Sequence, residues 1–297
     1  MIDVLAAVAV VISGVLAALA GLALLRFPDA ITRLHASAKS ATIGLIAAAL
    51  AAALEVDTIG AGALLILVAA LLFLSAPIAS SLLARAAYHD VETVLFLPGR
   101  DDLATAPINA EPTSPDERPG KASLLIGWLF IVWLALFASP SAGVLIGALA
   151  VGIGVSLALP GFRPRWPLGL LRPVAMVRFF AVLIRSLVLA NITVARAVID
   201  RRPLQPAIVR IPLRVTTRTE TTLLANAVTF TPGSVAIELS GRDLFVHVLD
   251  LRDEAALRAD IERLETSIIA AFGTRRERSM LNSNGDGLRP DRRTEGP

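Results

Sequence analysis

Charged and titratable side chains gather in one short stretch between two long apolar runs near the N-terminus. The stretch contains Arg26, Pro28, Asp29, Arg33, His35 and Lys39. Because histidine changes its charge near neutral pH, these residues could relay a proton or a cation at a contact within a larger assembly. The favoured interpretation is simpler: the charges orient the membrane helices and form hydrogen bonds between helices.

A second polar set lies in the C-terminal third of the chain. It contains Asn226, Thr229, Thr231, Pro232, Gly233 and His247. His247 falls in a predicted strand, where a structural hydrogen bond is favoured over a catalytic role. Asn226 precedes a turn, where an asparagine side chain commonly caps or bonds the backbone. We therefore expect this set to be a structural motif.

No recognised chemical motif accompanies these residues. The sequence lacks a phosphate-binding glycine loop, a nucleophile elbow and paired metal ligands. It has no cysteine, and its three histidines are far apart in the chain. The sequence therefore predicts no enzyme activity, no metal site and no cofactor.

Composition indicates a membrane protein. Of the 297 residues 55% are hydrophobic and 18% are charged, and the mean hydropathy is +0.69. Soluble domains are roughly 45–50% apolar and about 25% charged. The net charge is only +3, and the basic residues flank apolar runs, so nucleic acid is not an expected partner. Met1-Ile2-Asp3 lacks a positive region, so we expect a membrane helix there and not a cleaved signal peptide.

Five uncharged runs predict transmembrane helices, at residues 4–25, 40–54, 62–84, 122–138 and 141–159. Pro28 could start the second helix early, which would place Asp29 to Lys39 in its first turns. With five spans the flanking basic residues fall on one side: Arg26, Arg33 and Lys39; Arg85, Arg100, Arg118 and Lys121; Arg163, Arg165 and Arg172. The opposite side carries Asp3, Glu55 and Asp57. The positive-inside rule predicts a multi-pass protein of the cell (inner) membrane, with the N-terminus outside and the C-terminal domain in the cytoplasm.

Residues 174–199 are apolar enough for a sixth span, but their arginines are aligned. Arg178, Arg185 and Arg196 fall within about 20° of one another on a helical projection. The opposite face is predicted to carry Phe180, Leu183, Leu187, Val194 and Val198. This pattern is typical of an amphipathic helix in the membrane interface, in contact with lipid. A sixth span is the alternative, because Leu189 and Ile192 interrupt the polar stripe.

The remaining segments predict a linker, a small domain and a tail. Residues 97–120 are proline-rich and polar, which favours a linker, and residues from Thr274 to Pro297 resemble a disordered tail. Between them, apolar alternation predicts strands at 209–215, 235–239 and 243–249, and helices at 219–229 and after Asp253. Pro212 cannot donate to a sheet, so its strand should be an edge or bulged. The expected domain is α+β, in the order β-α-β-β-α.

The first polar stretch resembles the signature of the G subunit of the Mrp-type multisubunit cation/proton antiporters. The matching residues are Leu25-Arg26-Phe27-Pro28-Asp29, Arg33-Leu34-His35-Ala36, Lys39, Thr42 and Gly44. The second unit resembles the E subunit of the same complex, through Asn226 to Ser234 and through Val246-His247, with Phe230 where leucine is usual. The two resemblances cover roughly residues 1–90 and 122–272.

The resemblance implies a chain that fuses two accessory subunits. It divides into a G-like unit with three transmembrane helices (1–90), a linker (91–121), an E-like unit with two transmembrane helices and an amphipathic helix (122–202), a cytoplasmic domain (203–273) and a tail (274–297). The implied partners are large antiporter-like membrane subunits and other small membrane subunits. The implied function is assembly and support of sodium or other cation exchange, driven by the proton motive force. The alternatives are a membrane-anchored adaptor for a soluble protein or ligand, and a stand-alone transporter.

Overall fold

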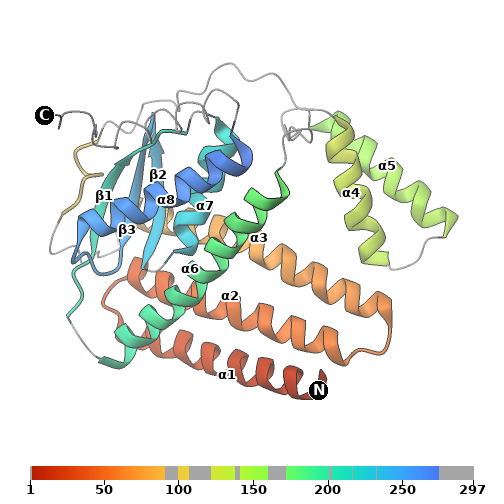
Figure 1. Cartoon of the computed structure of the whole chain (residues 1–297), viewed down its shortest axis with the longest axis horizontal. Coiled ribbons are helices and arrows are strands. Elements are labelled where there is room, and N and C mark those ends of the chain that lie inside the picture. The colour runs from red at the N-terminus through yellow and green to blue at the C-terminus, as the bar shows by residue number, and fades with distance from the viewer. Residues whose placement is uncertain are drawn as a thin grey trace, which may run out of the picture.

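The structure is a computed structural model, shown in Figure 1. It describes residues 2–90, 100–106, 122–137, 141–159, 172–200, 203–215, 217–231 and 233–273. The predicted tail, most of the predicted linker, Pro232 and the junction at Ser139-Pro140 lie outside these ranges.

Three long helices form an N-terminal bundle: α1 (Ile2–Arg26), α2 (Ala30–Glu55) and α3 (Ile59–His89). The turn between α1 and α2 ends at Asp29, whose side chain accepts a hydrogen bond from the Thr32 backbone N–H and caps α2. Pro28 therefore precedes the helix, which begins at Ala30. The first two helices approach closely at Gly44, where a Cβ atom would lie 3.2 Å from the Ser13 carbonyl oxygen.

Two shorter apolar helices, α4 (Ala122–Phe137) and α5 (Ala142–Ala158), form a hairpin beside α3. Gly147 of α5 lies against Trp133 and Gly152 lies against Ile126, so small residues allow the pair to pack closely. Outside this hairpin, four described helices are long and apolar enough to cross a membrane: α1, α2, α3 and residues Val174–Asp200. The membrane part of the protein is thus all-α, and a small domain with helices and strands follows it in the chain.

The last of these four helices, α6 (Pro173–Asp200), begins beside α7 and α8 and ends across the end of the bundle, next to α1 (Figure 1). Its buried residues include Leu183, Val194 and Val198, which the sequence placed on its inner face. The prediction was wrong at one position. Phe180 is 42% exposed, and its neighbour Phe179 is buried instead, packing edge-on against Phe272.

The C-terminal domain (residues 203–273) has a three-stranded antiparallel sheet in the order β1-β3-β2. Its elements are β1 (Ala207–Pro212), α7 (Arg218–Phe230), β2 (Ser234–Ser240), β3 (Asp243–Val248) and α8 (Glu254–Phe272). Pro212 ends the edge strand β1, whereas the sequence extended that strand to residue 215. Gly241, at φ +62°, occupies the tight turn between β2 and β3. Capping contacts of Thr217 and Asp253 start the two helices.

One face of this sheet is covered by helices of the C-terminal half of the chain. There α6, α7 and α8 bury a hydrophobic core that includes Leu183, Val209, Leu224, Val246 and Leu264. This core joins α6 to the domain that follows it in the sequence.

The opposite face of the sheet packs on the N-terminal bundle. Ile208 and Phe245 of the sheet meet Ile31 of α2 and Ala84 of α3, and Leu103 completes the cluster. The bundle therefore supplies part of the hydrophobic core of the C-terminal domain.

Part of the predicted linker is docked on the sheet. Asp101 forms a parallel bridge with Ile208 on the free edge of β1, and Leu103 is 1% exposed. The Ile208 N–H donates to the Arg100 carbonyl over 2.8 Å, and Arg100 also pairs with Glu254 over 2.7 Å. The expectation of a linker with little to bury is wrong for residues 100–106, because Leu103 fills a gap in the core and the backbone covers a sheet edge.

Candidate functional site

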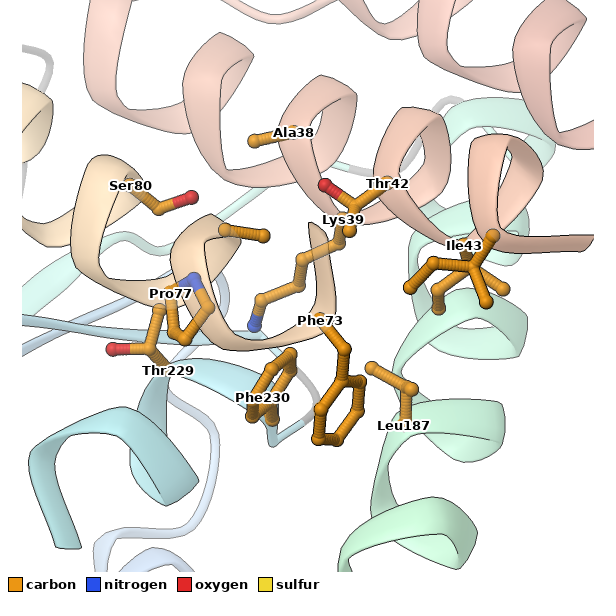
Figure 2. Close-up of a pocket in the computed structure, with 12 residues that line it drawn as sticks. Ala38, Lys39, Thr42, Ile43, Phe73, Pro77, Ser80, Leu187, Thr229 and Phe230 are labelled. Atoms are coloured by element: carbon orange, nitrogen blue, oxygen red, sulfur yellow. The ribbon is translucent and has the colours of Figure 1, made fainter. Parts of the chain in front are cut away.

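The two polar sets found in the sequence meet at one buried point between the N-terminal bundle and the C-terminal domain. Lys39 comes from α2, one turn after His35, and both side chains are buried, at 6% and 1% exposure. From the other side, α7 ends at Phe230 and the chain turns through Thr231 and Gly233 into β2. Figure 2 shows the Lys39 side chain pointing from α2 toward this turn.

The Lys39 amino group has three hydrogen-bond acceptors. It donates to the backbone carbonyls of Thr231 and Ser234, the second over 2.8 Å, and it lies 3.2 Å from His35 Nε2. An ammonium group has three N–H donors, so this arrangement satisfies it completely. The Thr231 carbonyl lies just beyond the C-terminus of α7, where the helix dipole favours a cation. We call Lys39 Nζ and these three acceptors the Lys39 site.

Side-chain hydroxyls fix the turn that presents the two carbonyls. The hydroxyls of Thr231 and Ser234 lie 2.6 and 2.8 Å from the Val228 carbonyl oxygen and contact each other. Each hydroxyl has one proton, so when one of them donates to the other, only the accepting hydroxyl donates to the carbonyl. Thr229 Oγ1 donates to the Ala225 carbonyl and accepts from the Ala236 N–H. Gly233 adopts φ +66°, a conformation that L side chains rarely adopt. These residues hold the Thr231 and Ser234 carbonyls in the positions where they accept hydrogen bonds from Lys39.

His247 of β3 lies behind His35, with ring centroids 6.1 Å apart. Burial, followed by the charge of Lys39, lowers the pKa of His247 to about 3, so this ring is neutral at pH 7. His35 Nε2 faces the Lys39 amino group, and with Lys39 as the donor the ring carries its proton on Nδ1. Neither His35 Nδ1 nor His247 Nδ1 has a hydrogen-bond partner within the described residues.

The other residues of the first polar set hold the turn between α1 and α2. Arg26 donates to the Val198 carbonyl of α6, and Arg33 Nε donates to the Phe27 carbonyl over 2.7 Å. Asp29 caps α2 as described above. Within the described residues these contacts join α1 to α6 and fix the start of α2.

Asn226 and the three arginines of α6 were also singled out in the sequence, and none of them is part of the Lys39 site. Asn226 lies inside α7, four residues before its end, so it does not cap the helix as one sequence interpretation had it. Arg178, Arg185 and Arg196 lie on the exposed face of α6 and do not contribute to the Lys39 site.

A small cavity of about 20 Å³, room for about one water, lies next to the Lys39 site. Its walls come from α2, α3, α6 and α7, and include Lys39, Pro77, Leu187 and Phe230 (Figure 2). Phe230 stacks on Phe73 of α3 with centroids 4.7 Å apart. No cluster of metal-ligating side chains is found in the described part of the chain.

Several contacts that join the two parts were not predicted from the sequence. Arg85 of α3 pairs with Glu238 of β2 over 2.7 Å, and Glu238 is 6% exposed. The acceptors for Lys39 are mainly backbone carbonyls, which leave no trace in residue type. The sequence of β3 did contain a signal that the sheet is covered on both faces, because residues 244–246 are consecutive apolar residues. Such a run indicates a strand buried on both faces.

Comparisons with known proteins match both parts of the chain. The family described as Na+/H+ ion antiporter subunit matches residues 126–271, and a second family described as Na+/H+ antiporter subunit matches residues 9–88. The G-type Na+/H+ antiporter subunit of Alkalihalophilus pseudofirmus is 36% identical over 93 residues, covering 30% of this chain and 76% of the relative. The E-type subunit of the same organism is 27% identical over 134 residues, covering 44% of this chain and 84% of the relative.

A chain of a solved archaeal respiratory membrane complex, the membrane-bound sulfane sulfur reductase, aligns with a TM-score of 0.44 and 25% identity over 51% of this chain and 98% of that chain. The two antiporter matches occupy separate parts of one polypeptide, in the order that the two signatures predicted. The chain therefore belongs to the Mrp-type Na+/H+ antiporter subunits, with a G-type unit fused to an E-type unit.

Proposed function

We propose that this accessory subunit fixes its G-like unit against its E-like unit within the antiporter complex, and that the complex needs this for assembly. The observation that supports this most is the Lys39 site, where an ammonium from the G-like unit is enclosed by two carbonyls of the E-like unit. The apolar contact between Ile31 and the Ile208 face of the sheet supports it as well. The fusion keeps together two units that share a core.

A structural role for the Lys39 site is favoured over an ion relay. All three donors of the ammonium are occupied, and no carboxylate is among its hydrogen-bond partners in the described residues. The runs 4–25, 40–54 and 62–84 contain no ionisable residue, and such residues commonly mark ion paths in membranes. We therefore place the path for sodium or another monovalent cation, and for the protons that drive its exchange, in partner subunits.

The proposed topology has five spans, α1 to α5, with the N-terminus outside and the C-terminal domain in the cytoplasm. The basic residues beside α1, α2 and α3 support this orientation, since Arg26, Lys39 and Arg85 all contact the C-terminal half of the chain. The helices α4 and α5 have 16 and 17 residues, near the lower limit for crossing the hydrocarbon core.

The composition of the purified complex tests the proposed function. A tag on the C-terminus, followed by extraction of native membranes in mild detergent, should recover large polytopic antiporter-like subunits together with this chain. The alternative of a membrane-anchored adaptor predicts a recovery dominated by soluble proteins. That outcome would remove the accessory-subunit proposal.

A further inference from the structure

Helix α6 has two apolar faces. The inner face packs against other described residues, and the outer face is exposed. The inner face contributes Phe179 and Leu183 to the core of the C-terminal domain, and Val194 and Val198 to a cluster with Leu249. The outer face exposes large apolar side chains along its whole length: Val174, Val177, Ile184, Val188, Ile192 and Ile199. A continuous apolar stripe of this kind is rare on a surface that faces water and marks a contact with a partner or a membrane.

A row of arginines runs beside the outer stripe. The spacing of Arg178, Arg185 and Arg196 places them within about 20° of one another around the helix. All three are exposed, and the described residues provide no ion pair or side-chain hydrogen bond for any of them. Arginine forms paired hydrogen bonds with phosphate oxygens, so the row has the chemistry to bind phosphate groups.

The packing of α6 favours a helix that lies along the membrane surface over one that crosses it. Its first half packs on α8 through Phe179 and Phe272. Its second half packs on Leu249, which directly follows β3, and on the α1–α2 turn region at Ala23, Phe27 and Ala36. Arg26, at the end of α1, donates to the Val198 carbonyl near the end of α6. Both halves therefore contact the C-terminal domain, and the second half also contacts the charged end of the bundle near Arg26. As a lipid-facing span, α6 would also carry its arginine row through hydrocarbon, which is costly.

We propose that α6 lies in the membrane interface on the side of the C-terminal domain, with its outer stripe in the acyl region and its arginine row bound to anionic phospholipid headgroups. Aligned positive charges beside a long apolar stripe are the pattern of interfacial helices that prefer anionic lipids. The bound lipid covers the outer face and holds the C-terminal domain against the membrane.

The first test measures depth along the helix. The chain has no cysteine, so single spin labels at Val177→Cys, Ile184→Cys, Ile192→Cys and Ile199→Cys have no background in it. In nanodiscs holding the full-length chain, all four labels should report one shallow depth from their accessibility to oxygen and to a water-soluble nickel complex. A depth that is greatest at the middle labels and least at the outer ones would show a span. Labels shielded from both reagents would show a protein partner. Either result overturns the proposal.

The second test measures lipid preference in two variants that each lose three arginines, one set from α6 and one set from elsewhere. The variant R178Q/R185Q/R196Q is compared with R242Q/R252Q/R263Q, which removes three exposed arginines from the C-terminal domain. Bound phosphatidylglycerol is counted against phosphatidylcholine by native mass spectrometry. The preference for phosphatidylglycerol should fall by about fivefold per arginine lost from α6, and stay unchanged in the control. Equal preference in wild type and in the α6 variant would refute the arginine row as a headgroup site.

Discussion

Replacement of Lys39 tests the contact between the two units directly. Lys39 is one of only two lysines in a chain whose lysines and arginines number 28, and its three-donor head matches three acceptors. Lys39→Met keeps most of the side-chain volume but removes all three donors. Two carbonyls and one ring nitrogen are then buried without this partner, at about 1 kcal/mol each or more. We expect a loss of roughly 3 kcal/mol in the free energy of the contact.

This loss becomes measurable when the two units are separate chains. Cutting the chain between residues 107 and 121 leaves the docked segment 100–106 on the first half. The dissociation constant of the two halves, measured in nanodiscs with labelled chains, should rise roughly 100-fold in Lys39→Met. The other lysine provides the matched control, because Lys121→Met should leave the constant unchanged. An unchanged constant in Lys39→Met would refute the assignment of binding energy to the buried ammonium.

The remaining predictions concern topology, the docked segment, pH and transport. A reporter fused after Arg202 should be cytoplasmic and one placed at Asp57 external; a cytoplasmic signal at Asp57 would exclude five spans. Leu103→Ala should lower the free energy of unfolding by about 2–3 kcal/mol, because Leu103 is buried in the contact; a neutral effect in thermal unfolding would contradict the docking. His247 has a pKa of about 3 when folded and near 6.5 when unfolded, so its stability contribution is complete above pH 6.5 and falls by about 1.4 kcal/mol per pH unit below it. His247→Gln should lessen this loss between pH 7 and 5, and an unaltered pH profile would argue against a buried neutral ring. The purified chain alone should show no sodium/proton exchange in proteoliposomes, whereas saturable exchange would favour a stand-alone transporter.

Local patterns predicted the elements of this fold well where one physical cause dominated. Uncharged runs located the apolar helices, and the early start expected near Pro28 is confirmed, because α2 begins at Ala30 and includes the charged turns before residue 40. Strand alternation located β1 but placed its end at residue 215, because the apolar alternation continues after pairing stops at Pro212. The projection of α6 failed at Phe180, since the helix packs against two partners and its inner face is displaced toward Phe179.

The site could be predicted only in its components. The sequence singled out His35, Lys39, Thr231 and His247, and the structure brings all four together. Their meeting depends on the docking of two units far apart in the chain, and no local periodicity encodes that docking. The docked segment at Leu103 was missed for a related reason: a single leucine in a polar stretch gives no periodic signal, yet it fills a gap between two surfaces.

A density map of the native antiporter complex, obtained by electron cryomicroscopy, would test the central claim most directly. We expect the Lys39 amino group within hydrogen-bond distance of the Thr231 and Ser234 carbonyls, with the sheet face at Ile208 and Phe245 covered by α2 and α3 of the same chain. A map in which Lys39 faces water, or in which a partner protein separates the N-terminal bundle from the C-terminal domain, would contradict it.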